Sequence, residues 1–270
     1  MACADVTSAN VVGYNNVPLL DGGTKMIGPC FITVGDADHT LKLSDLTIKG
    51  YENSEYYLCV ELAFGATFQI RQSNGMPEVT YQYSDLTDDC VTWNGGKWFN
   101  LDTGAEITKD NDVTFNAGDA FWFSAPDLQD CSGFYLASSG EVIKGSQAVE
   151  LKAGGTVGVC NLMPTATTLS QIEIQGYENS EYYLCVELMF GMTMQSLKSN
   201  GMPQVTYQYS DSTDDCATWN GGQWFNLDTG AEITTDNDVT IAAGEGFWAS
   251  APDLQDCDAF TFVVPACLAK

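Results

Sequence analysis

The chain has 270 residues, of which 44% are hydrophobic, enough to fill a core and too many for a disordered chain. Its 36 acidic and 10 basic residues give a formal net charge of −26. This charge argues against binding to nucleic acid or to an anionic membrane, because both need clustered Lys and Arg. No apolar run approaches the length of a membrane span, and the single histidine, His39, weakens every histidine-dependent mechanism.

An internal repeat is the main feature of the sequence. Residues 50–131 match residues 176–257 at a constant offset of 126 positions without a gap, and 66 of the 82 positions are identical. The similarity extends upstream of this block, so each unit has about 130 residues, a normal size for a domain. The sequence therefore predicts two tandem homologous domains, residues 1–138 and 139–270.

Short β-rich runs follow one another along each copy, and helical periodicity is nearly absent. In chain order the first copy has such runs at 56–62, 79–83, 97–101, 112–115 and 120–124. Residues 41–46 suggest one short helix, and the Asn-Gly-Gly sequence at 94–96 indicates a hairpin, because glycine accepts positive φ. Short strands with frequent turn signals predict an all-β fold of antiparallel sandwich or barrel-like domains.

Ten cysteines occur in this chain without any C-x-x-C pair. This pattern favours a disulfide framework over a zinc site, and hence an oxidising, extracellular compartment. Four cysteines in each copy correspond, and four cysteines allow three pairings. The pairing that we predict is Cys30–Cys59, Cys90–Cys131, Cys160–Cys185 and Cys216–Cys257.

Two further cysteines, Cys3 and Cys267, have no counterpart in the repeat and lie near opposite ends of the sequence. A Cys267–Cys3 bridge between molecules would join them head to tail, and contacts of this kind build open filaments. A bridge within one chain, or two reduced cysteines, is an equally good interpretation.

Differences between the copies concentrate in one segment. Six of the 16 differing positions fall within residues 63–72 of the first copy. Methionine suits an adaptable apolar interface, so we predict an intermolecular contact here, with a compensating change inside the core as the alternative. The residues of the second copy that carry this prediction are Met189, Met192, Met194 and Leu197.

Acidic clusters precede one corresponding cysteine in each copy. Carboxylates on loops suit calcium, although the EF-hand spacing is absent and Asp-rich turns are ordinary in β-proteins. The candidate calcium ligands are Asp85, Asp88, Asp89, Asp211, Asp214 and Asp215.

No arrangement for catalysis stands out in the sequence. Phosphate-binding loops and HExxH zinc motifs are absent. Glu55, Glu61 and Glu106 recur in the second copy, but an acidic chain supplies carboxylate pairs for glycoside hydrolysis by chance. We therefore expect no enzyme, and no cofactor other than calcium.

Tryptophans offer a route to sugar binding. Exposed indoles beside Asp and Asn can stack on sugar rings, whereas core filling is the favoured interpretation for Trp122 and Trp248. The candidates, which flank the Asn-Gly-Gly turns, are Trp93, Trp98, Trp219 and Trp224.

Two stretches carry a resemblance to known proteins. Residues 4–17 (ADVTSANVVGYNNV) are followed by a glycine-marked apolar run, and a G-[DE]-x-F-W motif occurs at 118–122 and again at 244–248. Together they resemble a group of uncharacterised secreted β-rich bacterial proteins. The resemblance implies an exported, β-rich protein without an assigned reaction, and it carries over no functional residues.

The sequence thus predicts an extracellular structural protein, a self-assembling subunit of a surface filament or layer built through head-to-tail domain contacts. A carbohydrate-binding or adhesive module of the cell surface is the alternative, with glycans as partners.

Overall fold

The structure is a computed structural model that describes residues 12–19, 22–35, 40–50, 66–71, 77–85, 95–126, 134–143, 146–161, 163–176, 191–197, 203–211, 221–253 and 259–264. Within these residues the protein is all-β, with antiparallel sheets, two single-turn 3-10 helices and no α-helix. The predicted all-β class is confirmed. None of the sheets that these residues form closes into a barrel.

The first repeat copy contributes ten described strands: β1 Val12–Leu19, β2 Thr24–Ile27, β3 Thr40–Lys42, β4 Thr47–Lys49, β5 Ala66–Arg71, β6 Pro77–Asp85, β7 Gly96–Asn100, β8 Thr114–Asn116, β9 Phe121–Ser124 and β10 Phe134–Glu141. They form a large sheet in the order β2-β9-β5-β6-β7, a smaller sheet in the order β1-β10-β4, and the pair β3-β8. The predicted helix at 41–46 is a single 3-10 turn, η1 (Leu43–Asp45).

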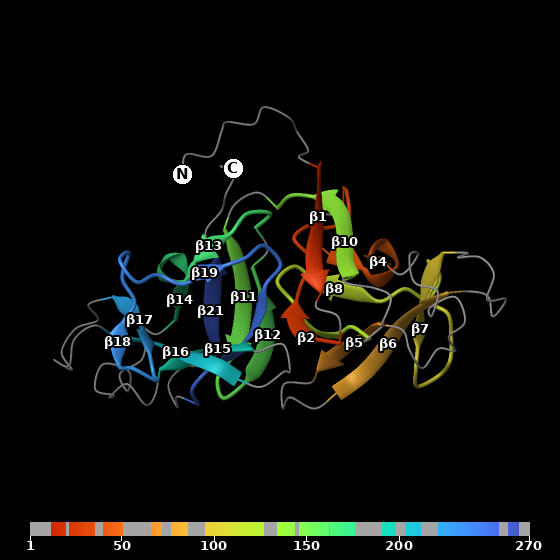
Figure 1. The fold of residues 1–270 in the computed structure, drawn as a ribbon. Coiled ribbons are helices and arrows are strands. Elements are labelled where there is room, and N and C mark those ends of the chain that lie inside the picture. Colours follow the sequence, from red (N-terminus) through yellow and green to blue (C-terminus); the bar gives the residue numbers. More distant parts are fainter. Residues whose placement is uncertain are drawn as a thin grey trace.

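The second copy contributes eleven described strands: β11 Gln147–Lys152, β12 Thr156–Cys160, β13 Thr167–Thr168, β14 Glu173–Gln175, β15 Met192–Leu197, β16 Pro203–Asp211, β17 Gly222–Asn226, β18 Ala231–Glu232, β19 Thr240–Ile241, β20 Gly246–Ser250 and β21 Ala259–Val264. Its large sheet has the order β12-β20-β15-β16-β17-β18, and its smaller sheet has the order β11-β21-β14. The turn η5 (Leu169–Gln171) corresponds to η1. The copies thus share one arrangement of corresponding strands, and they lie next to each other in Figure 1.

The boundary predicted at 138/139 falls inside β10. This strand continues to Glu141 and pairs with β1 along its whole length, from Phe134 opposite Leu19 to Glu141 opposite Val12. The first copy therefore extends beyond residue 138.

Each copy has its own cluster of buried side chains on the inner face of its large sheet. In the first copy the ring centroid of Phe68 lies 4.3 Å from that of Phe121 and 5.3 Å from that of Phe115. Large aromatic rings bury much apolar surface, and this burial is the main force that holds the sheets in place.

The second core is filled differently. Phe68 faces Phe123 across the β5–β9 pair, whereas the corresponding residues Met194 and Ala249 face each other across β15 and β20. Met192 is fully buried where the first copy has an alanine. Smaller residues at some sites and a larger one at another keep a core filled without changing the fold.

Candidate functional site

The two G-[DE]-x-F-W segments form matching turns that lead into β9 and β20. Gly118 and Gly244 have φ angles of 99° and 70°, which favour glycine. The acidic residue closes each turn, because the amide three positions earlier donates to Oδ2 of Asp119 at 2.9 Å and to Oε2 of Glu245 at 2.8 Å. The motif therefore sets a turn, directs its phenylalanine into the core and leaves its tryptophan half-buried on the outer face.

These turns are also where the two copies meet. The Gly28 amide, just after β2, donates to the Gly244 carbonyl at 2.9 Å, and the Cys160 amide at the end of β12 donates to the Gly118 carbonyl at 3.0 Å. Each copy presents the same two segments to the other, the motif turn and the strand that leads to its first matched cysteine. The contact is therefore reciprocal, as in a twofold-symmetric dimer.

Glycines allow this close approach. A Cβ at Gly28 would lie 2.2 Å from Sγ of Cys160 and 2.6 Å from the carbonyl oxygen of Asp119. A Cβ at Gly246 would lie 2.8 Å from both Cβ of Ala120 and Cγ of Met26. Side chains larger than hydrogen at these positions would force the copies apart.

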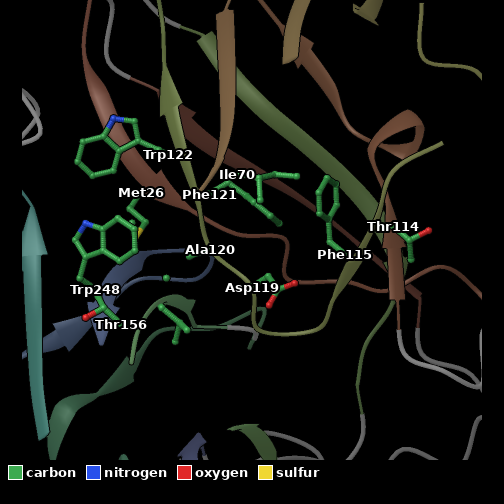
Figure 2. A pocket seen from close by; sticks show the side chains of 12 residues that line it. Met26, Ile70, Thr114, Phe115, Asp119, Ala120, Phe121, Trp122, Thr156 and Trp248 are labelled. Atoms are coloured by element: carbon green, nitrogen blue, oxygen red, sulfur yellow. The ribbon is translucent and has the colours of Figure 1, made fainter. Parts of the chain in front are cut away.

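The junction brings Trp122 and Trp248 together. Their ring centroids are 6.3 Å apart and their ring planes make an angle of 34°. With Met26, Asp119 and Thr156 they line a cavity of about 230 Å³ whose other walls are mainly apolar (Figure 2). Burial raises the pKa of the Asp119 carboxyl. An apolar cavity with a few polar groups on its wall is the usual form of a binding site for a small ligand.

Each tryptophan belongs to a row of side chains that crosses the outer face of its large sheet. In the first copy the strand registers place two rows side by side: Met26, Trp122, Gln69 and Thr80, and Thr24, Ser124, Thr67 and Gln82. In the second copy the rows are Gly158, Trp248, Gln195 and Thr206, and Thr156, Ser250, Thr193 and Gln208.

Hydrogen bonds within the rows orient their polar groups. Nε2 of Gln69 donates to Oγ1 of Thr80 at 3.3 Å, and the hydroxyls of Thr24 and Ser124 lie 3.0 Å apart. The second copy repeats both contacts, at 3.3 Å and 2.8 Å. Gln82 is buried, so the accessible part of this face lies over β2, β9 and β5 and over their counterparts.

In β5 and β9 the differences between the copies fall largely on the inner face. Several inward positions change, as from Phe68 to Met194 and from Phe123 to Ala249, although Phe121 is kept as Phe247. The outward residues that alternate with these positions are unchanged between the copies. In the first copy they are Thr67, Gln69, Trp122 and Ser124. Folding requires a filled core but not identical half-buried polar residues outside it. The outer face is therefore the candidate functional surface.

Cys30 and Cys160 both lie at the junction as buried free thiols, so the predicted Cys30–Cys59 and Cys160–Cys185 bridges are not formed. Cys30 accepts a hydrogen bond from Nδ2 of Asn15 at 3.2 Å. Burial raises the pKa of Cys30 to about 11 and raises that of Cys160 well above its usual value. The partners predicted for these two, and the other cysteines of the predicted framework, lie outside the described residues: Cys59, Cys90, Cys131, Cys185, Cys216 and Cys257.

Two of the predicted sugar-binding tryptophans are core residues. Trp98 and Trp224 are only 3% and 2% exposed, and each indole Nε1 donates to a buried carbonyl, of Leu46 at 2.8 Å and of Ile172 at 2.9 Å. A ligand cannot reach them, so the prediction is wrong for this pair. The other two candidates, Trp93 and Trp219, lie outside the described residues.

The methionines predicted to contact another molecule are buried as well. Met192 and Met194 point into the second core and are 0% and 2% exposed, so the alternative of a compensating core change applies to them. Leu197 ends β15. The remaining residues of this prediction, Met189, Cys3 and Cys267, lie outside the described part of the chain.

The predicted calcium ligands are mostly outside the described residues. Asp85 and Asp211 end the corresponding strands β6 and β16. Among the described residues, no group of three His, Cys, Asp or Glu side chains is placed to hold a metal ion. The other four predicted ligands lie outside the described residues: Asp88, Asp89, Asp214 and Asp215.

Sequence reasoning assigned Trp122 and Trp248 to the core, and this prediction is wrong. The two indoles alternate with buried residues, Phe121 and Phe123 along β9 and Phe247 and Ala249 along β20, and point to the outer face. The signal that identifies them is the pattern of differences between copies, since the position after the tryptophan changes from Phe123 to Ala249 while the tryptophan does not change.

Within the described residues, no helix is both long and apolar enough to cross a membrane. Comparison with known proteins gives no match: no family model, no curated protein and no solved structure is similar to this chain.

Proposed function

We propose that the protein is an exported carbohydrate-binding module and that the outer face around Trp122 and Trp248 binds the glycan. The observation that carries the proposal is that both copies have matching rows, which differ only in Met26 against Gly158 and which place a tryptophan beside glutamine, threonine and serine at the junction cavity. The unchanged outer residues contrast with the altered inner residues of the same strands.

The chemistry of the face fits a sugar. The C–H face of a pyranose ring is apolar and stacks on an indole, while its hydroxyls need hydrogen-bonding partners such as those of Gln69, Thr67 and Ser124. A net charge of −26 repels anionic polymers. We therefore infer that the ligand is a neutral glycan.

Titration with soluble glycans tests this proposal. The protein is titrated with a neutral β-glucan, a neutral α-glucan and polygalacturonate as the anionic probe, and binding is followed by calorimetry and by tryptophan fluorescence. We expect binding to a neutral glycan that weakens about tenfold in either Trp122→Ala or Trp248→Ala, the effect of losing roughly 1.4 kcal/mol of binding free energy. Tyr135→Ala, an exposed aromatic on the smaller sheet, is the matched control and keeps its affinity.

Two results would overturn the assignment. One is the absence of binding to every neutral glycan. The other is binding that survives unchanged in the Trp122→Ala/Trp248→Ala double variant. A preference for polygalacturonate would contradict the inference about charge.

Self-assembly is the second candidate function. The reciprocal contact between the two repeat copies of one chain is closed, because both copies contribute the same segments to it. These segments are therefore already occupied, and a second molecule cannot use them for head-to-tail growth. Self-assembly is favoured instead by the exposed apolar side chains around β1, of which Val12 and Tyr14 are the most exposed. An extracellular location and disulfides among the remaining cysteines belong to the same proposal.

A further inference from the structure

An apolar patch surrounds the strand β1. Four of the six large hydrophobic side chains that the described residues expose lie here: Val12 (64% exposed), Tyr14 (57%), Val34 (55%) and Tyr135 (46%). The first three line one shallow groove, and Tyr135 lies on β10 directly opposite Pro18 of β1. Single exposed hydrophobic residues are ordinary, but a contiguous group of them marks an interaction surface.

Little charge lies within this patch. None of the eight residues of β1 is charged, and the charged neighbours on its face are Glu141, opposite Val12, and Lys49 of β4, opposite Tyr135. In a chain with a net charge of −26, most of the surface repels a second copy of itself. The β1–β10 face is where two molecules can approach each other with few carboxylates between them, since Glu141 is the one acidic residue of these two strands.

The strand β1 lies at the edge of its sheet. The strand order is β1-β10-β4, and among the described residues no strand pairs with the outer edge of β1. Its counterpart β11 also lies at an edge, but it exposes Glu150 and Lys152, and such charges discourage pairing with another strand. Pro18 blocks pairing only near the end of β1, so most of the strand presents an edge that none of the described strands occupies.

We propose that β1 binds the β1 strand of a second copy, antiparallel and about a twofold axis. Pairing between the β1 strands of two molecules would join their three-stranded sheets into one continuous sheet. Because the contact uses the same strand of both molecules, it is closed and the product is a dimer. Val12 and Tyr14 lie on the outer face of that sheet, and the pairing buries part of them. The inference deepens the self-assembly proposal and does not depend on glycan binding.

Sedimentation of the full chain, with and without reductant, tests the dimer. We expect the mass to rise from 29.2 kDa to twice that value with concentration, independently of reductant. Asn16→Glu places a carboxylate on the outer face of β1 and should weaken the dimer by about tenfold or more, since two like charges then face each other. Ala148→Glu is the matched control, because Ala148 occupies the corresponding exposed position of β11 and the variant has the same net charge.

The outcomes separate the two proposals. A monomer at every concentration up to millimolar would overturn both the β1 contact and self-assembly. An oligomer that is equally stable in Asn16→Glu and in Ala148→Glu would overturn the β1 contact and leave self-assembly through another surface. An oligomer that dissociates on reduction would assign assembly to the cysteines and also overturn the β1 contact.

Discussion

Neighbouring residues in these strands have opposite surroundings. Phe68 is fully buried against other aromatic rings, whereas Gln69, the next residue, is half-buried beside Trp122 on the outer face. Because side chains alternate along a strand, a substitution acts on the core or on the face, but rarely on both. The surroundings of Cys30 also depend on its place in the fold, because its thiol is buried at the junction between the repeat copies and is not part of a disulfide.

We expect the stability of the protein to fall as the pH rises above about 9, in part through Cys30. Burial raises the pKa of this thiol from 9.0 to about 11, so the unfolded chain releases its proton at lower pH than the folded chain does. The stabilisation is fully present below pH 9.0 and is lost as the pH approaches 11. Urea unfolding of the wild type and of Cys30→Ala at a series of pH values measures the difference.

The Cys30→Ala variant should lose less stability between these pH values than the wild type. Alkylation of the native protein provides an independent check, because a thiol with a raised pKa reacts slowly at neutral pH. Rapid modification of Cys30 in the folded protein at pH 7 would contradict the prediction.

At the scale of elements, the junction between the repeat copies depends on glycines at or next to the ends of strands. The free edge of β2 and the segment before β20 approach closely because Gly28, Gly244 and Gly246 offer no Cβ to either side. The same turns position Trp122 and Trp248, so the geometry of the cavity follows from the glycines.

Gly28→Ala should open the junction. The new Cβ would meet a backbone oxygen at 2.6 Å, which cannot move aside as a flexible side chain can. We expect a loss of about 1–3 kcal/mol in the free energy of unfolding, the usual effect of overpacking, together with weaker glycan binding. Chemical denaturation and the glycan titration measure the two effects.

Gly104→Ala is the control for this substitution. Gly104 has a φ of 71° and nothing lies near a Cβ built there, so the variant suffers backbone strain alone and keeps its glycan affinity. Equal loss of affinity in both variants would mean that the junction does not shape the site.

At the scale of the whole molecule, charge opposes compactness. With a net charge of −26, the acidic side chains of the folded protein repel one another. The same charge would make two molecules repel each other wherever they meet outside the β1 face. The contact between the two repeat copies within one chain is closed, so the proposed β1 contact between molecules would give a discrete dimer and not an open filament.

Salt should stabilise the protein at neutral pH. Raising the ionic strength from about 0.01 M to about 0.15 M shortens the Debye length from about 30 Å to about 8 Å and screens the repulsion. We expect the melting temperature to rise over this range in thermal unfolding followed by circular dichroism. Near pH 4.1, the isoelectric point, the net charge vanishes and the same addition should have little effect. A salt response as large at pH 4.1 as at pH 7 would contradict this explanation.

The sequence alone determined the fold class and the local turns. The runs at 79–83 and 97–101 fall within β6 and β7 or one residue beyond, and Gly95 of the predicted turn has a φ of 92°. These features depend on residues close together in the chain: β-branched and aromatic residues favour strands, and glycine tolerates positive φ.

Only the tertiary structure decided which face of each strand is buried and which segments meet. Trp98 and Trp122 both lie in short aromatic runs, yet one fills the core and the other lies at the junction. Alternation in a strand defines two faces but does not say which one packs inward when both carry aromatic or hydroxyl side chains. The contact of Trp122 with Trp248, 126 positions apart, forms because the whole sheets dock, and no local pattern encodes that distance.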